Sequence, residues 1–173
     1  ISFHLRKARK IAYLREVCAE VCWELSEQAS DIYVVRADGI AKVFRSKFYD
    51  ENSEKRIPLD LLGLNAEDAA AILDGLCASD GSLKRGAWEY FSTSRQVAEA
   101  VQLLVLHAGG AAHVHHIDAI SRVMVLSRMT EPVINQGKKN TSWVEDFQGE
   151  VFCAHTRTGV LVVRRNGKIV LSG

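Results

Sequence analysis

The sequence predicts an α+β protein in which helices alternate with antiparallel hairpins, and three observations support this class. One helix-plus-hairpin pattern covers residues 6–36, and a second covers residues 94–128. The two copies match in hydrophobic pattern but not in residues, at an offset of about ninety positions. From about residue 135 onward, the chain changes to short strands and turns. This change predicts a boundary between residues 1–134 and residues 135–173.

The composition is that of an ordinary folded protein. A chain of 173 residues with 47% hydrophobic and 25% charged residues buries a full core as one or two small domains. No apolar run approaches the ~20 residues that span a bilayer, and no signal peptide is visible, so we expect no membrane partner. Four scattered cysteines indicate a reducing compartment and predict a cytoplasmic location. The net charge of +1 does not itself indicate nucleic-acid binding, although a local basic face is compatible with it.

Residues 6–22 predict the first helix, because apolar residues recur at helical spacing and basic residues crowd its start. Cys18 and Cys22 lie four positions apart on this stripe, and we interpret them as two small core residues rather than as a metal pair. The next elements are strands at residues 23–27 and 31–36, a short helix at 38–48 and a charged connector at 50–57.

A second helix is predicted to begin at Asn65, which is a favourable N-cap. Besides its apolar face, this helix has a face nearly free of side chains, formed by Ala71, Gly75 and Ser79. A glycine inside a helix costs about 1 kcal/mol relative to alanine, which makes sense if another helix approaches closely there. The alternative is an ordinary buried helix that ends by chance in an Asp-Gly step.

The next elements are a strand at residues 86–92, a helix at 94–106 ended by Gly109-Gly110, and strands at 112–116 and 122–127. Strand alternation places His113 and His115 on one face of their strand, with His116 on the other. A metal site is one reading of these histidines, but no nearby cysteine supplies the usual zinc spacing. We interpret these histidines as part of a polar sheet face, and we favour a DNA contact over a metal site as their function.

The stretch Leu-Asp-Gly-Leu-Cys-Ala-Ser-Asp-Gly at residues 73–81 resembles the dodecapeptide motif of the LAGLIDADG homing endonucleases. The leucines, the first glycine and the final Asp80-Gly81 step match at five of nine places. The other four places differ, with Asp74, Cys77, Ala78 and Ser79 replacing the usual alanine, isoleucine, aspartate and alanine.

A second resemblance lies in the tail, at residues 149–153 and 158–173. These residues are similar to the C-terminal splicing segment of phage-type inteins, with a Cys-containing strand, a Thr-Gly turn and Arg-Arg-Asn-Gly-Lys between two strands. The Asn166-Gly167 step between apolar runs is also the strongest hairpin signal in the chain. The two resemblances occur in the order expected of an intein that carries an endonuclease.

Together the resemblances imply αββαββα-type endonuclease units, one partial (residues 1–60) and one complete (61–134). All-β C-terminal strands of an intein (Hint) splicing domain follow at residues 135–173. The partial unit begins at its second strand, in residues 1–5, so its own motif helix is expected upstream. The implied partners are double-stranded DNA and a missing N-terminal half of the intein and endonuclease.

For the endonuclease, the resemblance implies that Asp80 is catalytic and binds Mg²⁺, a hard cation that prefers oxygen ligands. With a single motif the chain holds half an active site. The DNA contacts implied near the second sheet are Lys84, Arg85, Arg122 and Arg128, with Arg36 as a candidate at the first sheet. For each of these residues the alternative is a solvated surface charge.

For splicing, the resemblance implies that Cys153 is catalytic, and the alternative is a small buried residue in a strand. His155 stands where a threonine is expected, and Gly173 stands at the splice junction, one residue short of the asparagine that cyclises. The chain alone is therefore not expected to splice. Two rival identities remain: a free-standing DNA-binding protein of the endonuclease family that pairs with itself, and a degenerate remnant with neither activity.

Overall fold

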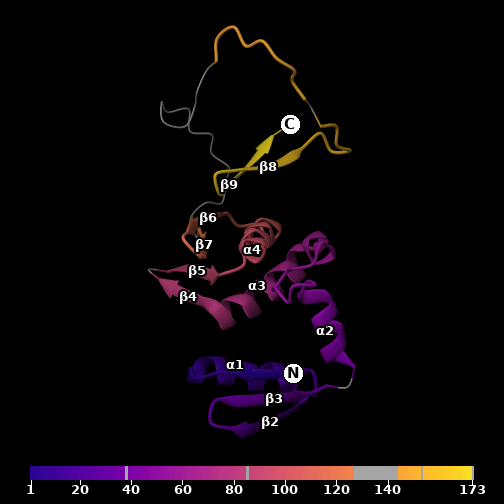
Figure 1. Ribbon diagram of the computed structural model, residues 1–173, viewed down its shortest axis with the longest axis vertical. Coiled ribbons are helices and arrows are strands. Elements are labelled where there is room, and N and C mark those ends of the chain that lie inside the picture. The colour runs from indigo at the N-terminus through magenta and orange to yellow at the C-terminus, as the bar shows by residue number, and fades with distance from the viewer. Residues whose placement is uncertain (38, 85, 127–143, 153, 173) are drawn as a thin grey trace.

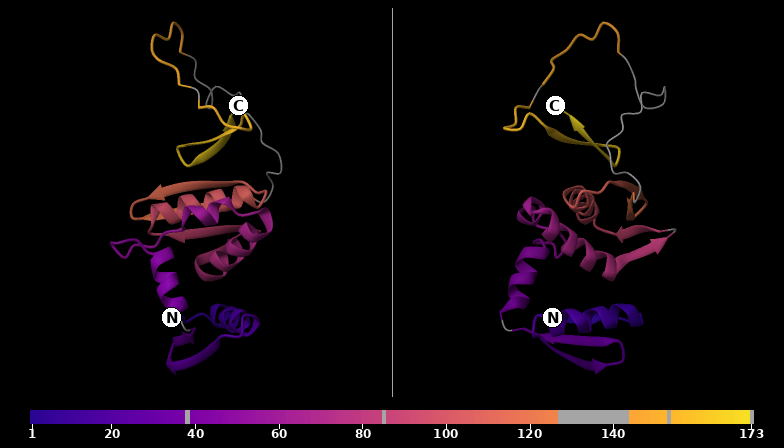
Figure 2. Two further views of the ribbon diagram at one scale, coloured as in Figure 1. Left: turned by 90° about the vertical axis from the view of Figure 1, so that its right-hand side faces the viewer. Right: turned by 180° about the vertical axis from the view of Figure 1, so that it is seen from behind.

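The computed structural model describes residues 1–37, 39–84, 86–126, 144–152 and 154–172 (Figure 1). Three parts follow one another along the long axis: a first helix-and-sheet region, a second one and a C-terminal hairpin. The views in Figure 2 show the same order. In the described part of the chain, no helix has the length and apolar character needed to cross a membrane.

The first region is a three-stranded antiparallel sheet with one helix lying across it. Its elements are β1 (Ser2–His4), α1 (Ala8–Glu20), β2 (Glu24–Ala29), β3 (Ile32–Arg36) and α2 (Ile40–Phe48), with the strand order β1-β3-β2. Tyr33 and Val35 on β3 are buried, and Cys18 is the buried residue of α1. Cys22 is exposed just after the helix at a positive φ of 55°, so its prediction as a core residue is wrong.

The second region is a four-stranded antiparallel sheet covered on one face by two helices. Its elements are η1 (Leu59–Gly63), α3 (Ala66–Asp80), β4 (Gly81–Lys84), β5 (Ala87–Ser92), α4 (Arg95–His107), β6 (Ala112–Ile117) and β7 (Ile120–Val125), with the strand order β4-β5-β7-β6. Both helices have N-caps: the Asn65 side chain accepts a hydrogen bond from the Asp68 N–H, as the sequence predicted, and Ser94 accepts one from Val97.

The core of the second region forms between α4 and the sheet. Leu104 and Ala98 on α4 and Val123 on β7 have no exposed surface, and Tyr90 on β5 is 5% exposed. Ala69 brings α3 into the same cluster. Helix α4 packs against the sheet on one side and against α3 on another, which explains why apolar residues occupy most of its circumference.

The C-terminal hairpin consists of β8 (Leu161–Arg165) and β9 (Lys168–Ser172), which form a two-stranded sheet of their own. Asn166 and Gly167 connect the strands with φ values of 50° and 71°. Left-handed backbone at both central positions is what a type I′ turn requires, and Asn-Gly is the preferred pair for it. The predicted turn is therefore confirmed.

One strand of the second region was not predicted. Strand β4 follows α3 without a loop and pairs antiparallel with β5, so that Gly81 lies opposite Tyr90 and Lys84 opposite Ala87. Its four residues, Gly-Ser-Leu-Lys, carry a single apolar side chain and give no alternating pattern. Because β4 begins where α3 ends, Asp80 lies at the junction between the helix and the sheet.

Candidate functional site

Asp80 ends helix α3, and its carboxylate is about half exposed, with 51% side-chain exposure. The Lys10 ammonium from α1 lies 3.3 Å from Asp80 Oδ1. Tyr90 lies close enough for the charge of Asp80 to act on its hydroxyl. Burial first, and this charge second, raise the pKa of Tyr90 to about 12.

Arg9 contacts the same end of α3. Its Nη1 donates to the Ala78 carbonyl at 2.9 Å, and its Nη2 donates to the Gly81 carbonyl at 3.0 Å. Carbonyls at a helix C-terminus lack partners within the helix and carry partial negative charge, so a guanidinium there is favourable. The start of α1 therefore places two cations around Asp80, a contact that the sequence analysis did not predict.

The small-residue face of α3 is partly used by α1. A Cβ at Gly75 would lie 3.7 Å from the Tyr13 hydroxyl oxygen, which is an ordinary van der Waals contact, so α1 lies against this glycine without needing the absence of a side chain there. Ala71 and Ser79 are exposed, and Ser79 Oγ donates to the Leu76 carbonyl of its own helix at 2.8 Å. The remainder of the predicted helix interface is thus uncovered in the described part of the chain.

A groove of about 550 Å³ opens beside Asp80. It lies between the connector after α2, which supplies Tyr49 and Glu54, and the segment from β5 to α4, which supplies Phe91 and Thr93. Within the described residues, no group of three or more His, Cys, Asp or Glu side chains is arranged to hold a metal. Asp80 is therefore a single carboxylate flanked by cations, and the described residues do not provide a full set of carboxylate ligands for Mg²⁺.

The sheet of the second region has an open face on the side away from α3 and α4. Tyr90, Val114 and Val123 point into the core, so alternate residues of each strand point to the other side. We call this side the open face; it consists of Ser82, Lys84, Ala87, Glu89, Phe91, His113, His115, Ile117, Ile120, Arg122 and Met124.

An ion pair lies in the middle of the open face. Arg122 Nη2 on β7 donates to Glu89 Oε1 on β5, and Glu89 is only 8% exposed. The Arg122 Nε is buried and has no hydrogen-bond partner among the described residues. Arg122 is thus where the sequence predicted it, on a sheet face with Lys84, but Glu89 fixes its orientation and neutralises its charge.

Two histidines extend the polar surface to the edge of the sheet. The rings of His113 and His115 on β6 lie with centroids 6.4 Å apart, and His115 is opposite Arg122. Burial, followed by the charges of Lys168 and His115, lowers the pKa of His113. The predicted shared face of His113 and His115 is confirmed, while His116 points the other way and bonds to Ser121 Oγ at 2.8 Å.

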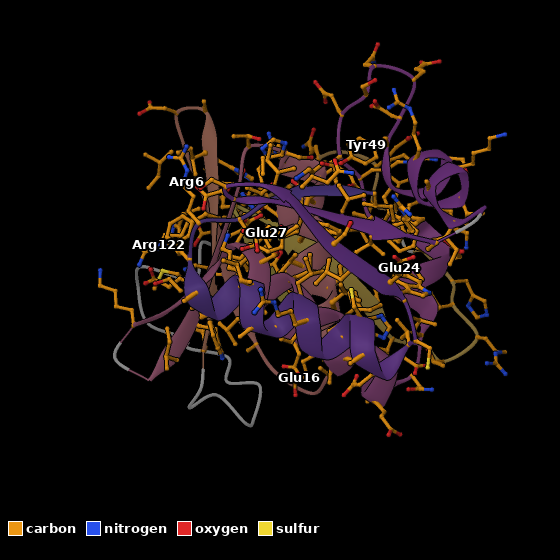
Figure 3. The ribbon with its side chains drawn as sticks, turned by 90° about the horizontal axis from the view of Figure 1, so that it is seen from below. Arg6, Glu16, Glu24, Glu27, Tyr49 and Arg122 are labelled. Carbon is orange, nitrogen blue, oxygen red and sulfur yellow. The ribbon has the colours of Figure 1, made fainter. Side chains whose placement is uncertain are left out.

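Some of the predicted site residues lie within the described part of the chain, and others lie outside it. Asp80 and Lys84 lie four positions apart on either side of the helix–sheet junction, and Arg122 lies two strands away from Lys84. Arg85, Arg128, Cys153 and Gly173 lie outside the described residues. Figure 3 looks at the molecule from the first region, with α1 and the strands β2 and β3 in front and Arg122 labelled on the second region behind them.

The fold is similar to solved structures of the homing endonuclease I-DmoI. A structure of mesophilic variants of I-DmoI matches with a TM-score of 0.51 and 12% identity, over 74% of this chain and 72% of that one. I-DmoI in complex with DNA and Ca matches with a TM-score of 0.51 and 13% identity, over 74% and 68% of the two chains. A variant with its target DNA and Mn matches with a TM-score of 0.50 and 14% identity, over 74% and 71%.

No protein-family model and no curated protein sequence matches the chain. At 12–14% identity, the structural similarity concerns the fold. The antiparallel sheets and their helices therefore define an α+β fold that resembles the LAGLIDADG endonuclease fold. These solved structures are of a homing endonuclease and do not test the predicted splicing part.

Proposed function

We propose that this chain binds double-stranded DNA on the open face and supplies one half of a metal-dependent endonuclease site through Asp80. The observation that carries the proposal is the junction of α3 with β4, which joins the motif carboxylate directly to a polar sheet face. The similarity to I-DmoI, whose structures contain target DNA and Mn or Ca, supports it.

The open face carries groups suited to a DNA groove. A two-stranded ribbon fits the major groove, where arginine donates to guanine and a carboxylate accepts from cytosine. Lys84 is exposed and forms no ion pair within the described residues, so it is available for a phosphate. Arg122 is held by Glu89, and this pair is better suited to reading base edges than to neutralising the backbone.

Cleavage requires a second carboxylate from outside the described residues. Hydrolysis of a phosphodiester by this class of chemistry uses divalent ions that generate the attacking hydroxide and stabilise the leaving oxygen. Asp80 supplies one carboxylate, and the exposed positions Ala71 and Ser79 leave room for a partner helix along α3. We propose that the partner is an N-terminal half that carries its own dodecapeptide motif.

The proposal is tested with DNA selected from a randomised duplex pool by binding to the full chain together with a fragment that carries the second motif. With Mg²⁺, the pair is expected to cut the selected duplex, and Asp80→Asn is expected to bind it but not cut it. Asp74→Asn is the matched control, because Asp74 lies on the same helix and is exposed. Parent-level cutting by the pair that carries Asp80→Asn would overturn the metal assignment.

A second function, protein splicing by residues 135–173 with the missing N-terminal half, is favoured by one observation. The tail forms the Asn-Gly hairpin that the intein resemblance implies, in a sheet separate from that of the second region. We propose that residues 1–134 are the endonuclease part and that Cys153 acts as a nucleophile in splicing.

The splicing proposal is tested in an intein reconstituted with the N-terminal half and the terminal asparagine. Cys153→Ala is expected to abolish splicing while circular dichroism stays unchanged, and Cys153→Ser is expected to retain part of it. Full splicing by Cys153→Ala would show that the thiol only packs. No splicing by the reconstituted parent would leave a DNA-binding protein without splicing activity.

A further inference from the structure

The tip of the C-terminal hairpin is fixed to the second region by a set of hydrogen bonds. The Gly167 carbonyl accepts from the Val114 N–H of β6 at 2.9 Å and from Gln102 Nε2 of α4 at 2.8 Å. Arg164 Nε donates to Gln102 Oε1 at 2.9 Å. Gln102 is fully buried, so these bonds satisfy polar atoms that would otherwise be costly to bury.

Arg164 adds a second anchor on α4. Its Nη1 donates to Glu99 Oε2 at 3.0 Å, and its Nη2 donates to the Glu99 carbonyl at 2.7 Å. A Cβ at Gly167 would lie 1.9 Å from the Val114 carbonyl oxygen, so only glycine fits at this contact between the tip and β6. The docked position is therefore a specific one.

Docking determines which way the other side chains of the tip point. Arg165 lies opposite Lys168 across the hairpin, while Arg164 lies opposite Ile169. Because neighbouring residues of a strand point to opposite faces, Arg165 and Lys168 lie on the face that turns away from Glu99 and Gln102. Lys168 begins β9, which contacts β6, and its charge acts on His113 of the open face, so Lys168 lies close to the edge of that face.

Arg165 and Lys168 form an uncompensated basic pair. Like charges directly opposite each other on a hairpin are destabilising. Both residues are exposed, and neither has a carboxylate within ion-pair distance among the described residues. Two cations opposite one another, beside a face that already carries Lys84 and two histidines, suit a polyanion.

We propose that the hairpin tip extends the DNA-binding surface beyond the edge of the sheet, with Arg165 and Lys168 each contacting a backbone phosphate. The inference rests on the proposed DNA-binding function. It assigns to the tail a role that is separate from splicing, because the docked tip makes the tail part of the nucleic-acid surface.

The test measures binding of the full chain to a random-sequence duplex as a function of NaCl concentration. The slope of log Kobs against log[salt] changes by about 0.9 for each phosphate contact. Lys168→Gln is therefore expected to reduce the slope by about 0.9, and Arg165→Gln with Lys168→Gln by about 1.8, with Kd raised roughly eightfold per contact at 0.1 M salt. Lys42→Gln, an equally exposed single charge change on α2, is the control and is expected to leave the slope unchanged.

A variant that moves the tip without changing charge completes the test. Gly167→Ala is expected to reduce the slope as much as the double variant, because its Cβ does not fit against Val114. If Lys84→Gln weakens binding but the tip variants do not, the inference fails and the proposed open face stands. If the parent shows no duplex binding, both the inference about the hairpin tip and the proposed DNA-binding function fail.

Discussion

The first region, residues 1–48, and the second region, residues 59–125, both contain the helix-and-hairpin pattern but differ in how much they bury. Helix α1 has one buried residue, whereas α4 has seven. The difference follows from what surrounds each helix: α1 lies across one small sheet, while α4 is enclosed by a larger sheet, by α3 and by the hairpin tip (Figure 1). The same pattern in sequence thus specifies helices that are buried to very different extents.

The largest contrast is expected from one leucine in each region. Leu104→Ala on α4 should lower the free energy of unfolding by about 3 kcal/mol, because the side chain is fully buried and leaves a cavity. Leu14→Ala on α1 should cost about 1 kcal/mol, because Leu14 is only half-buried. Urea denaturation measures both losses, and equal losses would contradict the difference in burial.

The second contrast concerns pH. The pKa of Tyr90 rises from its ordinary value near 10 to about 12, first because of burial and then because of the Asp80 charge. The fold therefore keeps this stability fully below pH 10 and loses about 3 kcal/mol as the pH rises from 10 to 12, because Tyr90 ionises first in the unfolded chain. Tyr90→Phe should remove this loss in urea denaturation between pH 9 and 12. An unchanged alkaline loss in the variant would refute the assignment.

A smaller effect is expected at the contact between the regions. Arg9→Gln removes the guanidinium from the Ala78 and Gly81 carbonyls and should cost about 1 kcal/mol. Arg15→Gln, on the same helix, changes only an exposed pair with Glu27 at 3.9 Å and should cost close to nothing. Hydrogen exchange at the end of α3 should accelerate in the first variant only; acceleration in both would show a general weakening of α1.

The smallest effect is expected for Lys10→Gln, which removes the ammonium 3.3 Å from Asp80. The pair is partly exposed, so the loss should be about 0.5 kcal/mol at low salt and should vanish near 1 M NaCl because of screening. Urea denaturation at two salt concentrations measures it. A loss that persists at 1 M NaCl would mean that Lys10 contributes through packing.

Much of the local structure was predictable from the sequence. The periodicity of apolar residues located α1, α3 and α4, and the Asn166-Gly167 step located the tail hairpin. These features depend on short stretches of chain. The same holds for the shared face of His113 and His115, which follows from strand alternation alone.

The contacts that define the site were not predictable in this way. Glu89 and Arg122 are 33 positions apart, and Arg9 lies about 70 positions from its partners at the end of α3. The sequence analysis noted the basic residues at the start of α1, but their partners depend on how the elements pack. Strand β4 was not predicted because its pairing with β5, rather than its own residue pattern, makes it a strand.

The hydrogen bond that the Val114 N–H of β6 donates to the Gly167 carbonyl has a consequence for solubility. Strand β6 is at the edge of its sheet, and such edges offer unpaired N–H and C=O groups to any other extended chain. The docked tip occupies the Val114 N–H, and β9 contacts β6 at this edge, where the tip presents two cations that repel another copy of the same surface. Removing the tail would therefore leave the edge of β6 free to pair with the same edge of another copy. A shortened protein is expected to aggregate even though its core is intact.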